Sequence, residues 1–279
     1  MTKSKSSRIA LMMTTSLKGG TGKSTFSCAL ADYLRTQGYP TAAYDADGSN
    51  GSFSSMHATR DEAGDILADQ DPLEGVVAYN VRNESRNTLI ASCENFSGLV
   101  LHDLAGSSLS ELQRIFEDGE DGLHNIFQVF ADLGVHPIFL HLITPDKATV
   151  NSVAHHLDLM DALGDLGSIA SHVAVLNQRG NQTMKDFPFW HGFTGADGAL
   201  LGGKTRARLL TAGGVEMILP HMNERTFAFA KDCHKPLSQA VTDAGLNIVD
   251  RQRIKLFNTE FAAAVTSEVR NILGLQHAQ

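Results

Sequence analysis

The stretch KGGTGKST, residues 18–25, decides the fold of this 279-residue chain. Its glycines let consecutive backbone N–H groups curve around an anion, and a helix that follows them presents its positive end there. In such a loop Lys23 reaches the β- and γ-phosphates of a nucleotide, and the Ser24 hydroxyl holds Mg²⁺. The common pattern requires glycine at position 17, where this chain has Leu17. The stretch is therefore a variant phosphate-binding loop, with Lys18 as an additional cation in front of it.

The residues around the loop have the pattern that a phosphate-binding loop requires. Residues 9–13 form a short apolar run, which predicts a buried strand. After the loop, apolar residues recur at three- and four-residue steps from Phe26 to Leu34, as an amphipathic helix requires. Gly38 and Pro40 then end the helix. A merely flexible glycine turn does not predict this order of strand, loop and helix.

The rest of the chain alternates in the same way. Further apolar runs predict strands at residues 41–44, 99–102, 137–143, 172–176 and 215–219, and a helical pattern covers residues 148–163. Strands that alternate with helices predict a mostly parallel sheet covered on both faces. We therefore expect a single doubly wound α/β domain over residues 1–279. Residues 76–81 and 88–91 are candidates for one more strand or a strand pair.

Two segments in the second half of the chain depart from this alternation of strands and helices. Residues 178–214 are rich in glycine and aromatic residues, which indicates either a functional insertion or a disordered excursion. We favour a partly ordered insertion that meets a partner. Residues 250–273 show the spacing of a long amphipathic helix, which could pack on the sheet or lie on a membrane surface. Glu260 and Glu268 oppose anionic lipid, so packing is favoured and membrane binding is not expected.

Charge and cysteine content narrow the function classes. A net charge of −8 argues against a protein whose whole surface is basic and binds nucleic acid. Two local basic clusters could still contact DNA or protein, or could be solvated helix faces: Lys204, Arg206 and Arg208, and Arg251, Arg253 and Lys255. The three cysteines, without any C-x-x-C spacing, indicate free thiols rather than disulfides or zinc, and hence the cytoplasm.

Carboxylates follow two of the predicted strands. Asp45 and Asp47 come after the second strand, and Asp103 ends the strand at residues 99–102. Each aspartate taken alone could be a turn or helix-cap residue. An apolar run that ends in aspartate after a phosphate-binding loop is, however, typical of the carboxylate that binds Mg²⁺ directly or through water. Together with the loop, these positions predict a site for a nucleotide with Mg²⁺.

The loop at residues 18–25, the Asp45-x-Asp47 strand end and the Asp-Leu-Ala-Gly of residues 103–106 resemble the ParA/MinD family of deviant Walker A ATPases. The resemblance spans most of the chain and implies a SIMIBI-type P-loop NTPase fold. It also implies a homodimer that closes over two ATP molecules, in which Lys18 is the signature lysine that reaches the partner's phosphates. By the same resemblance, Asp47 positions the attacking water and Asp103 lies in switch II.

The base that the site takes can also be predicted. GTPases of this superclass carry Asn/Thr-Lys-x-Asp after a late strand, whereas this chain has Asn-Gln-Arg-Gly at residues 177–180. The resemblance implies that Asn177 contacts adenine and that Pro220 closes the base pocket. ATP is therefore favoured over GTP. The predicted site comprises catalytic Lys18, Lys23 and Asp47; the nucleotide-binding residues Gly19, Gly20, Thr21, Gly22, Lys23, Ser24, Thr25, Asn177 and Pro220; and Ser24, Asp47 and Asp103 around Mg²⁺.

The C-terminal third resembles the TraL-type proteins of conjugative plasmids more than it resembles MinD. This narrower resemblance rests on Leu-Asn at 176–177 before the aromatic segment, Ile-Leu-Pro at 218–220, Pro-Leu at 236–237 and the basic residues of 251–255. It implies an ATP-dependent dimerisation switch with slow hydrolysis that positions or segregates a cargo, as in plasmid partition, DNA segregation or conjugation, through an adaptor or cargo protein. The alternatives are a metabolic ATP-dependent kinase or synthetase of the same superclass, and an ATP-binding dimerisation module without significant turnover.

Overall fold

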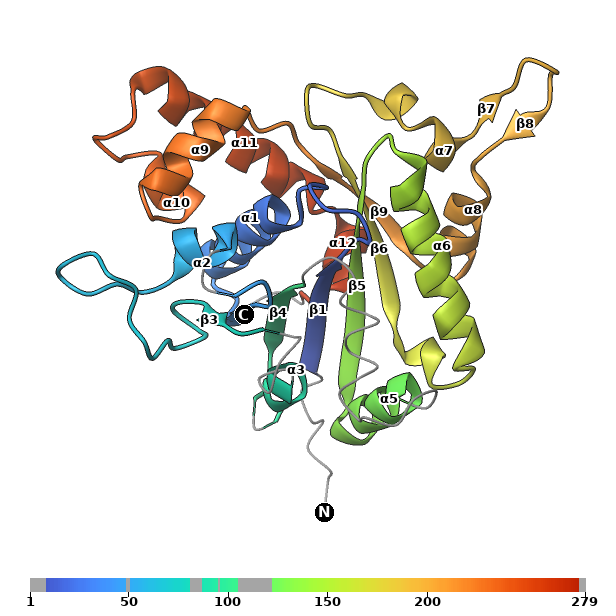
Figure 1. Ribbon diagram of the computed structural model, residues 1–279, viewed down its shortest axis with the longest axis horizontal. Coiled ribbons are helices and arrows are strands. Elements are labelled where there is room, and N and C mark those ends of the chain that lie inside the picture. Colours follow the sequence, from blue (N-terminus) through green and yellow to red (C-terminus); the bar gives the residue numbers. More distant parts are fainter. Residues whose placement is uncertain (1–8, 49–50, 81–86, 95, 105–121, 276–279) are drawn as a thin grey trace.

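A sheet of seven parallel strands forms the centre of the molecule (Figure 1). The structure is a computed structural model that describes residues 9–48, 51–80, 87–94, 96–104 and 122–275. The strand order is β3-β2-β4-β1-β5-β6-β9. The strands are β1 (Ile9–Thr15), β2 (Thr41–Asp45), β3 (Val77–Ala78), β4 (Leu99–Asp103), β5 (Val135–Ile143), β6 (Ser171–Asn177) and β9 (Val215–Leu219). Because β1 lies between β4 and β5, the chain order reverses there, and ligands bind outside the carboxyl ends of strands at such a point.

Helices cover both faces of the sheet (Figure 1). Alternate residues of β1 point to opposite faces, so Met12 packs in one core cluster while Leu11 and Met13 pack in another. The first cluster includes Phe26 of α1, and the second includes Phe127 of α5. The helices are α1 (Lys23–Thr36), α2 (Ser52–His57), α3 (Thr88–Ala91), α5 (Gly122–Leu133), α6 (Lys147–Ala162), α7 (Pro188–His191), α8 (Lys204–Thr211), α9 (Glu224–Asp232), α10 (Leu237–Ala240), α11 (Ile248–Ala264) and α12 (Ser267–Ile272).

The predicted fold class is confirmed: the protein is a doubly wound, parallel α/β structure. The candidate strand at residues 76–81 is only the two-residue β3, and position 81 lies outside the described residues. The candidate strand at residues 88–91 is wrong, because this segment is helix α3. Its β-branched residues favour a strand, but burial of Leu89 in the core and the Ser92 N–H bond to the Thr88 carbonyl favour a helical turn.

The single helix expected over residues 250–273 is two helices, α11 and α12. The break falls at Thr266, whose hydroxyl caps α12 by accepting a hydrogen bond from Val269 N at 3.4 Å. The apolar spacing continues across the break, since Val265 and Val269 are both buried. In α11, Phe257 and Phe261 pack in the same core cluster as α1. No helix in the described part of the chain is long and apolar enough to cross a membrane.

The glycine- and aromatic-rich segment is built around one buried tryptophan. Trp190 of α7 is fully buried, and its Nε1 donates to Glu216 Oε1 on β9 at 2.6 Å. Beyond α7 the chain forms a hairpin of β7 (Phe193–Thr194) and β8 (Leu200–Leu201), which projects from the body in Figure 1. Leu200 on this hairpin is 78% exposed. The segment is thus anchored at Trp190 and carries an exposed apolar side chain at Leu200, and its role as an insertion that meets a partner remains a prediction.

Arg35, near the end of α1, ties this helix to the chain before β3. Its guanidinium donates to the carbonyl oxygens of Thr41 at 3.1 Å, Pro72 at 2.7 Å, Glu74 at 3.0 Å and Gly75 at 2.8 Å. Burial lowers the pKa of Arg35, and the charge of Asp32 opposes that shift. Because the guanidinium stays protonated at any physiological pH, these bonds are permanent features of the fold.

Among the described residues, five histidines are buried in the core: His57, His102, His141, His156 and His172. In the described residues no group of three or more His, Cys, Asp or Glu side chains could hold a metal ion. The rings of His102, His141, His156 and His172 instead bond to each other or to hydroxyl groups. His141 Nε2 and His172 Nδ1 are 2.9 Å apart, and His156 Nε2 lies 3.0 Å from the Thr15 hydroxyl. Each of these rings is accommodated in its neutral form.

His57 should make stability depend on pH. Burial, helped by the charge of Arg35, lowers its pKa to about 3. Below about pH 6.5 the His57 side chain of the unfolded chain binds a proton that the folded chain does not. The free energy of unfolding therefore decreases as the pH is lowered, by about 1.4 kcal/mol per pH unit. The free energy of unfolding, measured in urea, should therefore decrease less for His57→Leu than for wild type when the pH is lowered from 7.5 to 5.5. The difference should be about 1.4 kcal/mol. The exposed-site control His124→Leu should keep the wild-type slope, and an unchanged slope in His57→Leu would contradict the prediction.

Candidate functional site

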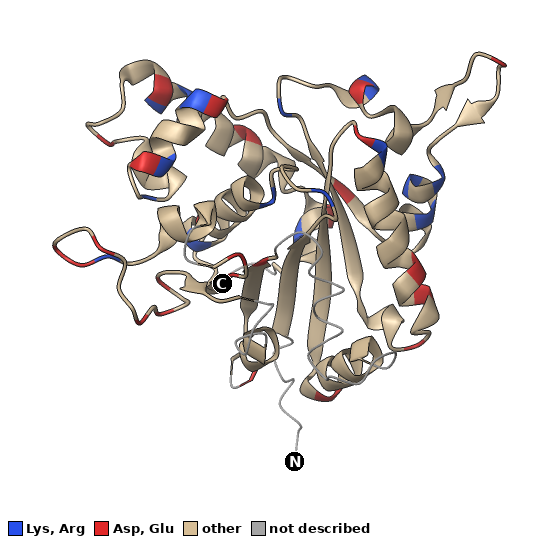
Figure 2. Cartoon of the chain, in the orientation of Figure 1, with Lys and Arg blue, Asp and Glu red and all other residues tan. Residues whose placement is uncertain are grey.

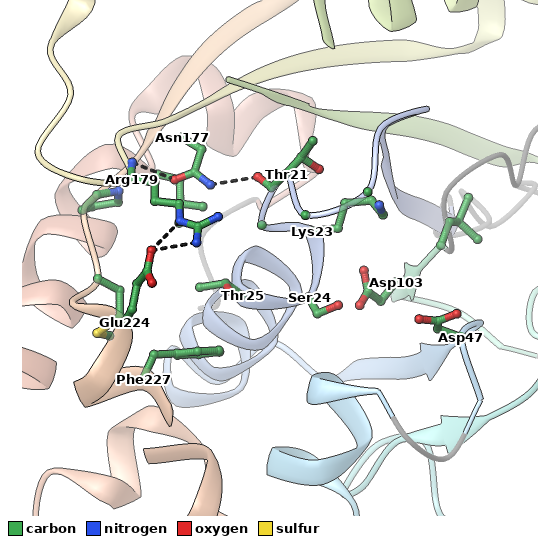
Figure 3. A pocket seen from close by; sticks show the side chains of 17 residues that line it. Thr21, Lys23, Ser24, Thr25, Asp47, Asp103, Asn177, Arg179, Glu224 and Phe227 are labelled. Carbon is green, nitrogen blue, oxygen red and sulfur yellow. Dashed lines mark hydrogen bonds and ion pairs between the residues drawn. The ribbon is translucent and has the colours of Figure 1, made fainter. Parts of the chain in front are cut away.

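A cavity of about 500 Å³ opens at the carboxyl ends of the central strands (Figure 3). It brings together residues that are up to about two hundred positions apart in the chain, as the switch point of the sheet requires. Every residue that the sequence predicted for the site lines this cavity except Lys18. The predicted residues that line it are Gly19, Gly20, Thr21, Gly22, Lys23, Ser24, Thr25, Asp47, Asp103, Asn177 and Pro220.

The loop before α1 has the backbone of an anion cradle. Gly20 and Gly22 have φ values of 70° and 92°, in the left-handed region that favours glycine. A Cβ at Gly22 would lie only 2.4 Å from Asn177 Nδ2, so glycine is required there for space as well. Helix α1 begins at Lys23, which places the positive end of a 14-residue helix at the cavity. The local structure thus fits a phosphate group.

Two carboxylates and a hydroxyl face one side of this cradle (Figure 3). Asp103 is 3% exposed, and its Oδ1 accepts a hydrogen bond from the Thr14 hydroxyl at 2.8 Å. Burial raises the pKa of Asp103, while hydrogen bonds from Ser24, Thr14 and Ser27 and the charge of Lys23 oppose that shift. Burial lowers the pKa of Lys23, against the charges of Asp103 and Asp47. Oxygen donors of this kind, beside a phosphate cradle, fit Mg²⁺.

The two aspartates after β2 have different surroundings. Asp45 is fully buried and accepts hydrogen bonds from Ser54 N at 3.0 Å, the Ser54 hydroxyl at 2.8 Å and Asp47 N at 3.1 Å. Burial and the charge of Asp103 raise the pKa of Asp45 to about 6. Asp47 is exposed to the cavity. Asp45 therefore shapes the turn, and Asp47 is the carboxylate available for chemistry.

The other end of the cavity lies around Asn177, which is 6% exposed (Figure 3). Its Nδ2 donates to the Thr21 carbonyl at 2.8 Å, and its Oδ1 accepts from Arg179 N at 3.1 Å. Asn177 thus anchors the phosphate loop to β6 in addition to any contact with a base. Apolar side chains line this end of the cavity, namely those of Leu219, Pro220, Met222 and Phe227.

Several site residues were missed by sequence reasoning. Arg179 and Glu224 form an ion pair of 2.7 Å at this end of the cavity, joining the chain after β6 to α9. Met222 and Phe227 complete the lining. These residues belong to no motif, and only the position of Arg179 two residues after Asn177 could have drawn attention to it. Thr14 and Ser27, which support Asp103, read as ordinary strand and helix residues.

Lys18 lies outside the cavity that the rest of its loop forms. Its Nζ donates to Asp146 Oδ2, and the other carboxylate oxygen of Asp146 caps α6 by accepting from Ala148 N at 2.8 Å. The hydrogen bond from Lys18 is the main reason that the pKa of Asp146 is lowered. The side chain of Lys18 is 47% exposed. The additional lysine is thus held on the surface at the beginning of α6.

The two basic clusters lie on α8 and α11, where Figure 2 colours Lys and Arg blue, and they differ in how many of their charges are paired. Arg206 pairs with Glu216 at 2.7 Å, and Arg208 pairs with Asp158 and Asp161 at 2.6 Å each. In the other cluster Arg253 lies 3.4 Å from Asp250, while Arg251 and Lys255 form no ion pair with any described residue. Of the two predicted DNA contacts, the α11 cluster therefore retains more free charge.

Residues 12–139 match the family model of the CobQ/CobB/MinD/ParA nucleotide binding domain. No curated protein sequence matches the chain. A Cyanothece McdA variant, solved as an ATP complex, has a similar fold, with 13% identity, a TM-score of 0.51, and coverage of 98% of this chain and 99% of that one. The MinD cell division protein of Aquifex aeolicus is 15% identical over 91% of this chain and 97% of its own, with a TM-score of 0.46.

A ParA family ATPase from Chlorobium tepidum TLS is 13% identical over 90% of this chain and 99% of its own, also with a TM-score of 0.46. At 13% identity the McdA structure shows only a shared fold, and the matched nucleotide binding domain covers the phosphate loop, Asp47 and Asp103. These findings show that residues 12–139 are similar to a CobQ/CobB/MinD/ParA nucleotide binding domain, and that the chain shares its fold with McdA.

Proposed function

We propose that this protein is an ATP-dependent dimerisation switch that hydrolyses ATP slowly and uses the cycle to position or segregate a cargo. The observation that carries the proposal is the place of Lys18. It directly precedes a complete phosphate loop, yet it does not line its own cavity and is instead paired on the surface with Asp146. An exposed ion pair in water is weak. Lys18 can therefore leave Asp146 and contact the phosphates of ATP bound to a second copy of the chain.

In the proposed cycle the chain binds ATP together with Mg²⁺. The backbone N–H groups of residues 19–23 and the Lys23 ammonium hold the phosphates, and Ser24 and Asp103 hold Mg²⁺. The metal would neutralise charge that develops on the phosphates. Asp47 orients the attacking water, and Asn177 and Pro220 border the adenine. The absence of a guanine-reading Lys-x-Asp after Asn177 supports ATP as the nucleotide.

The cargo class is proposed from the sequence. The resemblance of the C-terminal third to TraL-type proteins supports plasmid partition or conjugation, with an adaptor or cargo protein as partner and the cytoplasm as the place of action. The projecting hairpin with exposed Leu200 supports a protein contact. Arg251 and Lys255, which form no ion pair with a described residue, support a secondary contact with DNA phosphates.

The proposal is tested by measuring oligomeric state and ATP turnover on the same protein. Sedimentation with a non-hydrolysable ATP analogue and Mg²⁺ should convert monomers to dimers, and ADP should not. Turnover should be low and should rise when plasmid DNA or a co-purifying partner is added. Stimulation by a small-molecule acceptor instead, in a protein that stays monomeric, would indicate a kinase or synthetase. Dimers without measurable turnover under all these conditions would indicate a binding module.

A further inference from the structure

A shallow apolar groove lies beside the edge strand β3 and shares no lining residue with the nucleotide cavity. Its volume is about 540 Å³. Val76 and Val77 line one part of it, and Ile66 and Leu67, from the chain between α2 and β3, line another. Ile66 and Leu67 are 38% and 42% exposed. Adjacent exposed apolar side chains in a groove are typical of a contact surface.

The groove borders an open sheet edge. Strand β3 is the first strand in the sheet order, and among the described residues it pairs only with β2. An edge strand presents unpaired N–H and C=O groups, to which an extended segment of another chain can add. Successive side chains of such a segment point to opposite sides. Every second side chain would therefore enter the groove, and those between would point out of it, within reach of charged side chains of the neighbouring loop that do not line the groove.

That loop is strongly acidic, and we call residues 60–74 the acidic loop. Figure 2 shows its acidic residues along the projecting chain between α2 and β3. Its basic residue, Arg60, is engaged by the carbonyl oxygens of Gly64 at 2.8 Å and Ser55 at 3.1 Å. No ion pair between described residues neutralises any of its six carboxylates: Asp61, Glu62, Asp65, Asp69, Asp71 and Glu74. The surrounding charge therefore favours a cationic occupant and repels nucleic acid.

The acidic loop is preorganised by Gln70. The Gln70 amide accepts from Thr59 N at 2.8 Å and from the Thr59 hydroxyl at 2.9 Å, and it donates to the Thr59 carbonyl at 2.9 Å and the Leu67 carbonyl at 2.8 Å. Gly75 makes room for this amide, since a Cβ there would lie 2.2 Å from Gln70 Oε1. A surface that is already ordered loses little conformational entropy on binding.

We infer that the groove and the β3 edge dock an extended segment of a partner protein in which cationic and small apolar side chains alternate. The apolar side chains fill the groove beside Leu67, the cationic ones pair with carboxylates of the acidic loop, and the backbone pairs with β3. This inference does not rest on the proposed ATPase cycle, because the groove shares no lining residue with the nucleotide cavity.

The test uses fluorescein-labelled octapeptides and the full chain without nucleotide, in low salt. A peptide of alternating Lys and Val should bind, a Glu/Val analogue should not, and a Lys/Ser analogue should bind more weakly. Asp65→Asn combined with Asp69→Asn should weaken binding of the Lys/Val peptide about 2- to 30-fold. Leu67→Ser should weaken it as well. The control pair Asp165→Asn and Asp197→Asn removes the same charge from the turn after α6 and from the β7–β8 hairpin, and it should leave the affinity unchanged.

Hydrogen exchange locates the bound peptide. The Lys/Val peptide should slow exchange of backbone amides in residues 66–70 and 77–79. Protection confined to other regions, or equal binding of the Glu/Val analogue, would overturn the inference. So would an affinity that neither Leu67→Ser nor the Asp65/Asp69 variant changes. Circular dichroism of each variant checks that it is folded, and ATP-dependent dimerisation measured on the same variants keeps this result separate from the proposed function.

Discussion

Lys18→Ala should lower ATP turnover by about 10³–10⁵-fold at most, equivalent to roughly 4–7 kcal/mol of transition-state stabilisation. The reason is that a cation supplied across a subunit interface stabilises charge on the transferred phosphoryl group. ATP binding should be retained, because Lys18 does not line its own cavity. ATP-dependent dimer formation should be impaired. Equilibrium binding of a fluorescent ATP analogue, sedimentation and phosphate release measure the three quantities.

Lys147→Ala is the matched control for this variant. Lys147 is the exposed lysine immediately after Asp146, so its removal changes the local charge equally without touching the loop. It should leave turnover and dimerisation at wild-type values. ATP-dependent dimers of Lys18→Ala with unchanged turnover would contradict the role of Lys18 in trans.

Asp47→Asn should lower the rate of hydrolysis by about 10²–10⁴-fold, the contribution expected of a carboxylate that orients or deprotonates the attacking water. The fold should be intact, because Asp45 binds the backbone N–H of Asp47 rather than its side chain. ATP should still bind, and dimers should accumulate because they are not dissolved by hydrolysis. Single-turnover assays with labelled ATP measure the step directly, and the exposed-site variant Asp165→Asn should behave as wild type.

A mixture of the Lys18→Ala and Asp47→Asn variants shows whether Lys18 acts on the partner subunit's site or on its own. In a mixed dimer, the Lys18→Ala subunit keeps Asp47 and receives Lys18 from its partner, so one of the two sites is complete. Equal amounts should therefore recover turnover, to roughly a quarter of wild type where the two variants pair at random, because half of such dimers are mixed and each has one complete site. If Lys18 acted within its own subunit, neither site would be complete. The mixture would then be as inactive as each variant alone.

The parts of the fold that were predictable from sequence are those with strong local signals. Strands β1, β4, β5 and β6 are buried on both faces and therefore read as continuous apolar runs. The two-residue β3 has no such run. The break before α12 was hidden because Val265 and Val269 maintain the helical spacing across it.

The site residues that could be predicted from sequence are likewise those with strong local signals. The phosphate loop, Asp47 and Asp103 were found because each stands at a strand end or in a glycine-rich motif. Arg179 and Glu224 were not found, since their pairing depends on how α9 lies against the chain after β6. A sequence does not show such a contact across 45 residues. For the same reason the pairing of Lys18 with Asp146, 128 residues away, is visible only in three dimensions.

Helix α1 gives the molecule a mechanical connection between two surfaces. Its first residue, Lys23, lies in the phosphate cradle. At its other end, Arg35 donates hydrogen bonds to the carbonyl groups of Pro72, Glu74 and Gly75. Fourteen residues make a rigid rod about 21 Å long. The phosphate cradle and the base of the acidic loop are therefore joined through one rigid element.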